Sequence, residues 1–404
     1  METRQIDSDS IVDVVFHLKW KSENAVHTDG FQASRINIWR DFLPPFFLEK
    51  IKKKQAGERI ELRLKSDDVL PEFDRRNLLQ VKSSQFDRRA MVDTIAGPGV
   101  GRFYPKGILK DVAGVFTANV QPFRCVELDN GHIKVDFNHP LSSKDLVLSA
   151  VIGKVENKEI ERGGSSVDWM DEITTGPGMQ ARWQDRQTDF FSAKAFQRQD
   201  ESADTRFYSE PRYVQHIDDT AIEMVKNTYG RFLKDDMRVL DLMSSWKSHL
   251  PDNLNFRRLV GLGLNERELK KNSRLSERVV QDLNLNSRLP FESNSFDAAV
   301  CTVSVEYLTD PLAVFEEVSR VLQPDGYFIV TFSNRWFPTK AIKIWKELHE
   351  FERMGMVLEY FLRAGGFKNL QTYSLRGLPR PHDDKYYPDL WYSDPIYAVW
   401  GQKR

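Results

Sequence analysis

The sequence has few cysteines and no long apolar run. Its two cysteines, Cys125 and Cys301, are far apart and match no metal-ligand spacing, so neither a disulfide framework nor a zinc site is expected. No stretch of 18 apolar residues occurs, which argues against a transmembrane helix. The first ten residues, METRQIDSDS, lack the apolar core of a signal peptide. We therefore expect a cytoplasmic protein in which both cysteines are small buried side chains.

The chain also lacks a charge excess of either sign. Its formal net charge is −1, with 40% hydrophobic and 29% charged residues, which is typical of a globular protein. The one concentrated basic run, residues 50–54, contains no aromatic residue and is interpreted as a solvated helix face. Neither a nucleic acid nor a membrane is therefore expected as a partner. Nothing in the sequence indicates an oligomeric state or a metal site.

At 404 residues the chain is long enough for more than one domain. Residues 1–160 favour an α+β domain with an antiparallel sheet and one helix near 41–54. Apolar and polar residues alternate there, and Asp129-Asn-Gly131 has the composition of a hairpin turn. The expected strands are 11–18, 59–64, 132–137 and 145–152.

Residues 161–220 are polar and contain two glycine-rich breaks, at 163–166 and 176–178, so we expect a linker. From 221 to 404, helical and strand-like segments alternate, which predicts an α/β domain with a mostly parallel, doubly wound sheet. Ligands of such sheets bind at the carboxyl ends of the strands. The expected helices are 221–233, 311–322 and 339–363, and the expected strands are 238–243, 259–264, 279–283, 298–302 and 327–332.

Three motifs of this region resemble class I S-adenosylmethionine-dependent methyltransferases. VLDLMSS (239–245) stands where that family carries V-L-D-L-G-x-G-x-G. PFESNSFDAAV (290–300) resembles its L-P-F-x-D-x-S-F-D strand, and AVFEEVSRVLQPDG (313–326) resembles the helix and turn ending in R-V-L-K-P-G-G. The resemblance implies a Rossmann-like, type 11-like methyltransferase domain with S-adenosylmethionine as cofactor.

The resemblance also implies which residues would contact that cofactor. The loop after the first strand should wrap the methionine part, Asn265 should face the ribose, the residues after the third strand should hold the adenine, and Val303 should face the methyl group. The implied residues are Asp241, Met243, Ser244, Ser245, Trp246, Asn265, Asp282, Leu283 and Val303. The sequence departs from the family pattern because the glycines after Leu242 and the acid at the end of the second strand are missing. A degenerate fold without cofactor therefore remains an alternative.

A base assists methyl transfer to a protonated oxygen or nitrogen atom, and His216, Glu306 and Tyr307 are the candidates. His216 belongs to a polar and aromatic segment, with Tyr208, Arg212 and Asp218, that enters the first helix of the domain. This segment is interpreted either as a cover over the cofactor or as a plain helix entry in which Asp218 or Asp219 is the N-cap and His216 a surface imidazole. Glu306 could equally be a surface carboxylate.

In the first 160 residues, NGHIKVDFNHPLSSK (130–144) resembles the V-D-x-N-H-P-L-A-G-K segment of SlyD-type FKBP prolyl isomerases. The resemblance implies an insert-in-flap module at about 75–130 and an aromatic peptide-binding cup. The candidates for that cup are Phe16, Asp29, Trp39, Phe46 and Phe137. Each aromatic side chain could instead be core. We expect peptide recognition more than efficient isomerisation, and the His-rich metal-binding tail of that family is absent.

Three functions therefore remain open. The first is a methyltransferase whose FKBP-like module holds a peptide or protein substrate. The second is a prolyl isomerase or chaperone-like binding protein with a degenerate methyltransferase fold. The third is a methyltransferase for a small molecule, in which the N-terminal module only aids folding.

Overall fold

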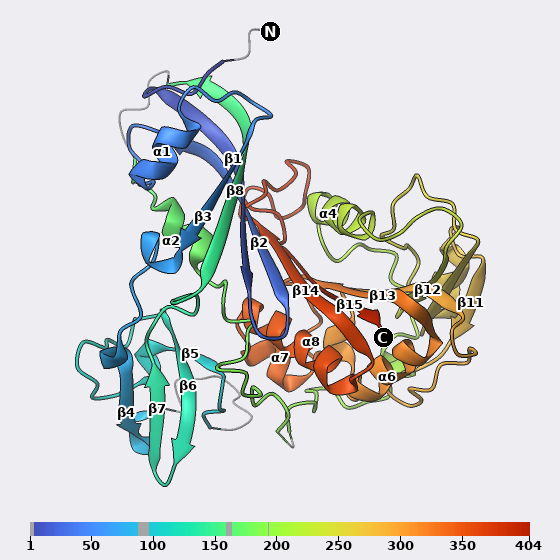
Figure 1. Ribbon diagram of the computed structural model, residues 1–404. Coiled ribbons are helices and arrows are strands. Elements are labelled where there is room, and N and C mark those ends of the chain that lie inside the picture. Colours follow the sequence, from blue (N-terminus) through green and yellow to red (C-terminus); the bar gives the residue numbers. More distant parts are fainter. Residues whose placement is uncertain (1–3, 88–96, 159–163, 193) are drawn as a thin grey trace.

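The computed structural model describes residues 4–87, 97–158, 164–192 and 194–404. Most of its strands form one twisted, mixed sheet of 11 strands in the order β11-β10-β9-β12-β13-β15-β14-β2-β1-β8-β3 (Figure 1). A second sheet of four strands, β4-β7-β6-β5, lies apart from it. Part of the predicted insert, residues 88–96, lies outside the described residues.

The N-terminal part contributes four antiparallel strands to the large sheet: β1 (Ser10–Lys21), β2 (Val26–Asn37), β3 (Arg59–Lys65) and β8 (Asp145–Asn157). Because side chains alternate between the two faces of a strand, Val14, Phe16 and Leu18 of β1 all enter one core. The helices α1 (Pro45–Ile51) and α2 (Trp169–Thr174) supply Phe47 and Trp169 to the same core. The predicted antiparallel sheet is present, but the predicted strand 132–137 belongs to the second sheet, and the helix is shorter than expected.

The four-stranded sheet is an insert between β3 and β8, with its own apolar core around Phe123 (Figure 1). The turn at Asn130 and Gly131 joins β6 to β7, and Gly131 has a φ of 85°, so the predicted hairpin is confirmed. Its strands are β4 (Leu78–Lys82), β5 (Phe103–Pro105), β6 (Pro122–Asp129) and β7 (His132–Asp136). Short 3-10 turns flank them at Ser66–Asp68, Arg75–Asn77, Ser83–Gln85 and Lys106–Ile108.

The C-terminal part supplies the other seven strands. The first five pair in parallel, and β15 runs antiparallel to both of its neighbours, β13 and β14. The strands are β9 (Arg238–Leu242), β10 (Arg258–Gly263), β11 (Glu277–Val280), β12 (Phe296–Thr302), β13 (Leu322–Phe332), β14 (Phe367–Arg376) and β15 (Ile396–Lys403). The helices are α3 (Asp204–Phe207), α4 (Asp219–Tyr229), α5 (Glu266–Lys271), α6 (Pro311–Val321), α7 (Lys343–Glu347) and α8 (Glu350–Ala364).

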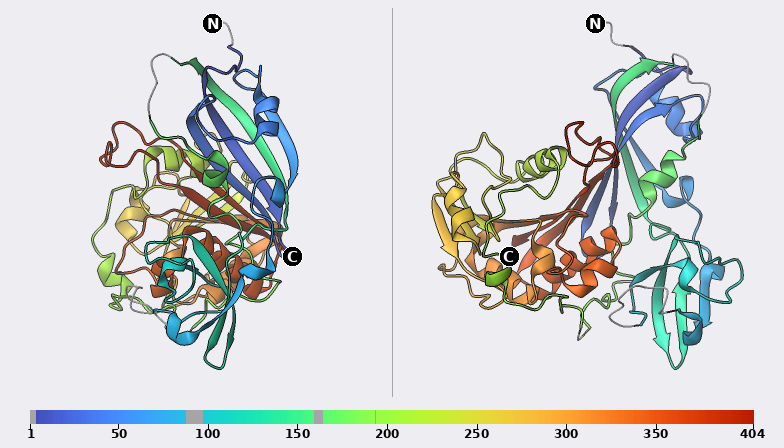
Figure 2. Two further views of the ribbon diagram at one scale, coloured as in Figure 1. Left: turned by 90° about the vertical axis from the view of Figure 1, so that its left-hand side faces the viewer. Right: turned by 180° about the vertical axis from the view of Figure 1, so that it is seen from behind.

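Helices cover both faces of this half of the sheet, with α4 on one face and α6, α7 and α8 on the other (Figure 2). In β9, Val239 enters the core under α4, whereas Leu240 and Leu242 enter the core under α6 and α8. Such strands are apolar on both faces, which explains their nearly continuous hydrophobic runs. No helix lies between β9 and β10, where residues 243–257 form a loop.

The two halves are joined edge to edge, because β2 pairs in parallel with β14 (Figure 1). Buried polar groups cross this seam: His27 Nδ1 lies 2.8 Å from Thr372 Oγ1, and Ser374 Oγ donates to Asp29 Oδ1 at 3.0 Å. Gln180 Nε2 also donates to Asp29 at 3.1 Å. The sequence did not indicate this pairing, and two separate sheets were expected.

The predicted linker packs against both halves. Trp169 lies in the N-terminal core and Phe190 in the C-terminal core. Gly176 and Gly178, with φ of 101° and 98°, provide left-handed backbone that L-residues rarely adopt. The described part of 161–220 is therefore a structural bridge, although its polarity suggested a solvent-exposed connection.

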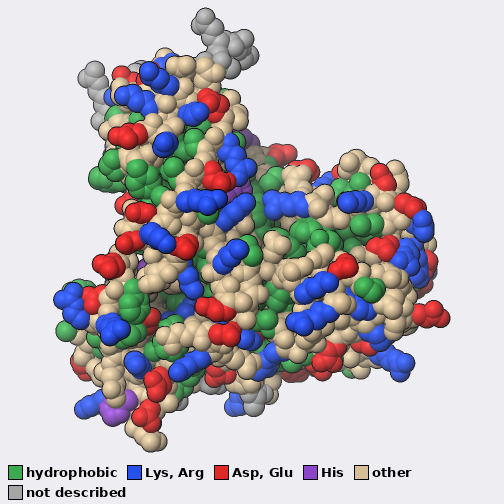
Figure 3. All heavy atoms as spheres, viewed as in Figure 1, with side chains coloured by type: hydrophobic (Ala, Val, Ile, Leu, Met, Phe, Trp, Pro, Cys, Tyr) green, Lys and Arg blue, Asp and Glu red, His purple; other side chains and the backbone are tan. Residues whose placement is uncertain are grey.

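Acidic and basic side chains are interspersed over the face in Figure 3, in keeping with the balanced composition. Both cysteines are buried and unpaired, as predicted. Among the described residues, no helix is long and apolar enough to cross a bilayer.

Candidate functional site

A cavity of about 480 Å³ lies at the carboxyl ends of β9, β10, β11 and β12. Its volume falls in the range of small-molecule sites in proteins. The covering segment, residues 204–217, and the loop 377–395 between β14 and β15 also contribute to its wall. The lining residues used below are Asp204, Tyr208, Arg212, Gln215, His216, Lys247, His249, Glu268, Asn284, Tyr307, Arg335, Trp336, Phe337, Lys385 and Tyr386.

All nine residues that the methyltransferase resemblance assigns to the cofactor line this one cavity, although they follow four different strands. They are Asp241, Met243, Ser244, Ser245, Trp246, Asn265, Asp282, Leu283 and Val303. Two of the three candidate bases, His216 and Tyr307, line it too. The third, Glu306, does not.

The loop after β9 turns without the expected glycines. Met243 adopts a positive φ of 56°, and Ser244 N donates to Leu262 O of the neighbouring strand at 2.7 Å. A Cβ at Gly263 would collide with the backbone oxygen of Ser244. The close approach of the two backbones therefore depends on a glycine of β10, and not on a glycine in the loop after β9.

Asp241, near the carboxyl end of β9, holds this loop through two hydrogen bonds. Its carboxylate accepts hydrogen bonds from Ser244 Oγ at 2.6 Å and from Ser248 Oγ at 2.5 Å. Burial raises the pKa of Asp241, against the lowering effect of these two hydroxyls. The serines therefore fix the carboxylate at the floor of the cavity.

Asn265 and Glu268 connect the end of β10 to the covering segment. Asn265 caps α5 through its Oδ1, which accepts from Arg267 N at 2.9 Å, while its Nδ2 donates to Tyr208 O at 2.8 Å. Glu268 accepts from Ser245 Oγ at 2.5 Å and from Arg212 N at 2.6 Å. Both Oδ1 and Nδ2 of Asn265 thus have partners within the protein, and Glu268 is an acidic residue of the site that was not predicted. A cap followed three residues later by Glu is a helix-start signal that could have drawn attention to it.

Asp282 follows β11 and lies beside Leu283 in the cavity wall. Its Oδ1 accepts from Asn284 N at 2.9 Å, and its Oδ2 takes no hydrogen bond from the part of the chain that the structure describes. That oxygen is therefore available to a donor in the cavity.

A buried ion cluster holds the covering segment in place. Asp204 accepts from Arg198 Nη1 and Asn284 Nδ2, at 2.7 and 2.8 Å, and lies 3.1 Å from the fully buried ammonium of Lys340. Burial alone would raise the pKa of Asp204, but hydrogen bonds from Arg198, Asn284 and Lys340 hold it below its usual value. The segment is thus fastened to the residues after β11 and β13.

Neighbouring residues of the turn after β12 point in different directions. Because a 3-10 helix has about three residues per turn, successive side chains diverge by roughly 120°. Tyr307 faces the cavity and its Oη accepts from Phe337 N at 2.9 Å. Glu306 instead enters the protein interior with 1% exposure and does not line the cavity, so its interpretation as a surface carboxylate is wrong, and its role as a base stays a prediction.

Two histidines lie on the cavity wall. Burial of the ring and the nearby Arg212 lower the pKa of His216, whose ring packs edge-on against Phe337 with 4.9 Å between centroids. Burial lowers the pKa of His249 to about 4, and its buried Nδ1 has no partner among the described residues. Both imidazoles are therefore neutral at pH 7.

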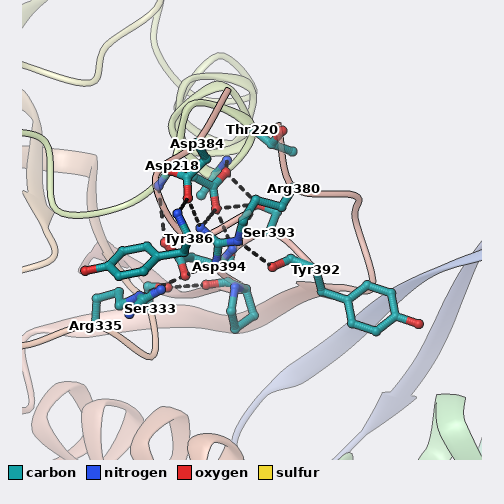
Figure 4. Close-up of polar contacts among 12 residues, drawn as sticks. Asp218, Thr220, Ser333, Arg335, Arg380, Asp384, Tyr386, Tyr392, Ser393 and Asp394 are labelled. Atoms are coloured by element: carbon teal, nitrogen blue, oxygen red, sulfur yellow. Dashed lines mark hydrogen bonds and ion pairs between the residues drawn. The ribbon is translucent and has the colours of Figure 1, made fainter. Parts of the chain in front are cut away.

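The loop 377–395 is held by a buried charge network, shown in Figure 4. Arg380 pairs with Asp394 at 2.7 Å and with Asp218 at 3.4 Å, and Asp394 also pairs with Arg335 at 2.9 Å. Asp218 accepts from Ala221 N at 3.0 Å as the N-cap of α4, so the helix-entry interpretation is confirmed for this residue. The loop was not predicted as part of the site.

The five candidates for a peptide-binding cup lie in different places. Phe16 is fully buried and its ring centroid is 5.4 Å from that of Phe47; Asp29 is buried at the seam. Phe46 packs against the N-terminal core. Trp39 stacks with Lys158, whereas Phe137 belongs to the insert and packs near Phe123. These side chains do not form one open cup.

No curated protein matches the sequence. Among solved structures, part of this chain is similar to the putative methyltransferase in complex with the Trm112 methyltransferase activator from Haloferax volcanii (19% identity, 46% of this chain and 90% of that chain, TM-score 0.35). Another is an S-adenosylmethionine-dependent methyltransferase from Mesorhizobium loti (15% identity, 46% of this chain and 99% of that chain, TM-score 0.32). A third is a putative methyltransferase from Bacillus halodurans (13% identity, 46% of this chain and 98% of that chain, TM-score 0.33). Residues 246–330 match the family described as a methyltransferase domain.

Proposed function

We propose that the protein is an S-adenosylmethionine-dependent methyltransferase. One observation carries the proposal: nine residues implied by the family motifs, from four separate strand ends, line a single cavity. A chance arrangement would scatter them, because residues 241 and 303 are more than 60 positions apart in the sequence. The carboxyl ends of parallel strands are also where such folds bind nucleotides.

The residues present fit this cofactor. Asp241 and Glu268 place carboxylates near the loop that would hold the methionine and ribose parts, and Asp282 keeps one carboxylate oxygen free for the adenine amine. When bound, S-adenosylmethionine supplies a methyl group activated for in-line displacement. The walls of the cavity would exclude water and align the acceptor, which supplies much of the rate in such a reaction.

His216 is the best candidate base. A neutral imidazole on the cavity wall can accept a proton from an oxygen or nitrogen acceptor, whereas burial raises the pKa of Tyr307 well above its usual value and keeps its phenol protonated. Tyr307 would therefore position the acceptor through its hydroxyl. Glu306 has no part in this proposal.

Titration calorimetry with S-adenosylmethionine and S-adenosylhomocysteine tests the cofactor. We expect micromolar binding that weakens roughly 10- to 100-fold in Asp282→Ala, because a hydrogen bond to a charged group contributes about 1.5–3 kcal/mol. Asp389→Ala, which removes an exposed aspartate of the loop 377–395, should bind like the wild type. Absence of binding by the folded wild type would refute the cofactor site.

A second proposal concerns the N-terminal half, which we infer to be a peptide-binding, FKBP-like module. Two exposed apolar side chains on its insert, Phe116 (74%) and Val120 (84%), favour contact with a peptide. Efficient isomerisation is not expected, since Phe16 is fully buried. This proposal is independent of the methyltransferase site.

The module is tested with a permanently unfolded protein as the ligand and a proline peptide as the isomerase substrate. Phe116→Ser with Val120→Ser should weaken binding of the unfolded protein at least fivefold, and the isomerisation rate should stay within tenfold of the uncatalysed rate. The control Leu285→Ser removes an equally exposed apolar side chain (78%) from the other half. Equal binding by the double variant and the wild type would rule out the insert as the contact surface.

A further inference from the structure

We propose that the methyl acceptor is an anion, and that Arg335 and Lys385 bind its carboxylate or phosphate group. The inference rests on the proposed function and names the substrate class for the same cavity. It starts from a charge imbalance among the lining residues, in which the carboxylates have partners within the protein and several cations do not.

The carboxylates are already engaged. Asp204 is held by Arg198 and Lys340, and Asp241 by two serine hydroxyls. Glu268 accepts from Ser245 and from the backbone of Arg212. Asp282, the least occupied of the four, lies at the end of β11, on the adenine side of the proposed cofactor. No unengaged carboxylate is thus found near Arg335 among the described lining residues.

The cations differ in this respect. Arg212, Lys247 and Lys385 form no ion pair with any residue that the structure describes. Arg335 pairs with Asp394 through its Nε at 2.9 Å, but its Nη2 is buried and has no hydrogen-bond partner in the described chain. Its Nη1 is not buried and also donates to no described residue, so an anionic ligand in the cavity that accepts from Nη1 would form a charge-assisted hydrogen bond.

Arg335 and Lys385 lie together around one ring. The guanidinium carbon of Arg335 is 4.6 Å from the centroid of Tyr386, and Lys385 Nζ is 4.7 Å from it. Asp394 accepts from Nε of Arg335, on the same edge of the guanidinium as the buried Nη2, and leaves Nη1 for a ligand; Figure 4 shows Arg335 beside the buried network. Trp336 and Tyr386 add flat apolar surface, which suits an acceptor with a planar ring.

The position of this pair separates it from the cofactor. Arg335 follows β13, four strands from β11 and Asp282 in the sheet order. At about 4.8 Å per strand this places the two ends roughly 19 Å apart. Val303, which would face the methyl group, follows β12 and lies between them. Arg335 is therefore on the acceptor side of the methyl group, whereas Lys247 follows Trp246 on the methionine side.

The test compares small aromatic probes with and without a negative charge. Binding of 4-hydroxybenzoate, its neutral amide 4-hydroxybenzamide and phenyl phosphate is measured by ligand-observed NMR on the full chain saturated with S-adenosylhomocysteine. We expect the anions to bind at least tenfold more tightly than the amide, and Lys385→Met and Arg335→Met each to remove most of that preference. A preference for phenyl phosphate over the benzoate would identify a phosphate acceptor, and the reverse a carboxylate acceptor.

Lys385 is exposed and lies outside the buried network, so its variant keeps the test valid if Arg335→Met fails to fold. Lys368→Met removes an exposed lysine far along β14 and should leave the preference unchanged. Equal binding of the amide and the anions would overturn the proposal. So would a tenfold loss of S-adenosylmethionine affinity in Lys385→Met, because the cation would then serve the cofactor. Failure of the wild type to bind S-adenosylhomocysteine would instead refute the proposed function.

Discussion

Replacement of Arg380 by methionine should lower the free energy of unfolding by about 3–5 kcal/mol, the usual cost of breaking a buried ion pair. Its side chain is 2% exposed and contacts three carboxylates, of which Asp218 and Asp394 are 0% and 3% exposed. Without the guanidinium, Asp218 has no charged partner and Asp394 keeps only Arg335. Chemical denaturation monitored by circular dichroism measures the change.

The matched control is Arg257→Met. Arg257 also pairs with an aspartate, Asp236, but both side chains are more than 60% exposed. Exposed pairs contribute about 0–1 kcal/mol, so this variant should unfold almost like the wild type. Similar losses in both variants would show that burial does not determine the stability contributed by the network around Arg380.

Replacement of Glu306 by glutamine should make the protein more stable at high pH. Burial raises the pKa of Glu306 to about 8, although its own backbone and Arg353 act in the opposite direction, and its Oε2 has no hydrogen-bond partner in the described chain. Between pH 4.5 and 8 the unfolded chain releases this proton while the folded chain keeps it, so the wild type loses stability as pH rises. The glutamine variant lacks this loss.

Between pH 5 and pH 8.5, the free energy of unfolding of Glu306→Gln should therefore rise relative to that of the wild type by about 2–5 kcal/mol. One pKa unit corresponds to about 1.4 kcal/mol. Denaturant titrations at both pH values measure it, and all other titrating groups cancel in the comparison. Glu292→Gln, at an exposed position, should show a constant difference. A pH-independent difference for Glu306→Gln would mean that the carboxyl is ionised and paired in the folded protein.

The periodicity of the sequence predicted most strands of the C-terminal half, because parallel strands buried on both faces are continuous apolar runs such as 298–302. The nine residues taken from the motifs also line one cavity, since they lie at strand ends and strand ends are fixed by the strands themselves. The predicted helix 339–363 is divided into α7 and α8 around Leu348 and His349. His349 caps α8 by accepting from Phe351 N, a weak signal in the sequence.

Long-range arrangements could not be predicted. β14 and β15 were not identified, and nothing local in β2 indicates that its partner lies about 345 residues away, although His27–Thr372 and Asp29–Ser374 join them. The direction in which Glu306 points depends on a single turn, and the role of the loop 377–395 depends on contacts with Asp218 and Arg335. Such contacts follow from tertiary packing, which sequence patterns do not encode position by position.

The parallel pairing of β2 with β14 also bears on aggregation. A sheet edge with unsatisfied amides and carbonyls is a template for other chains, and proteins usually protect it with charge, proline or a covering element. Here each half protects the other: β2 occupies the edge of β14, and β14 occupies the edge of β2. Either half expressed alone would therefore expose an unpaired edge strand that other chains could pair with. Fusion of the two halves protects both from aggregation, whether or not they share a reaction.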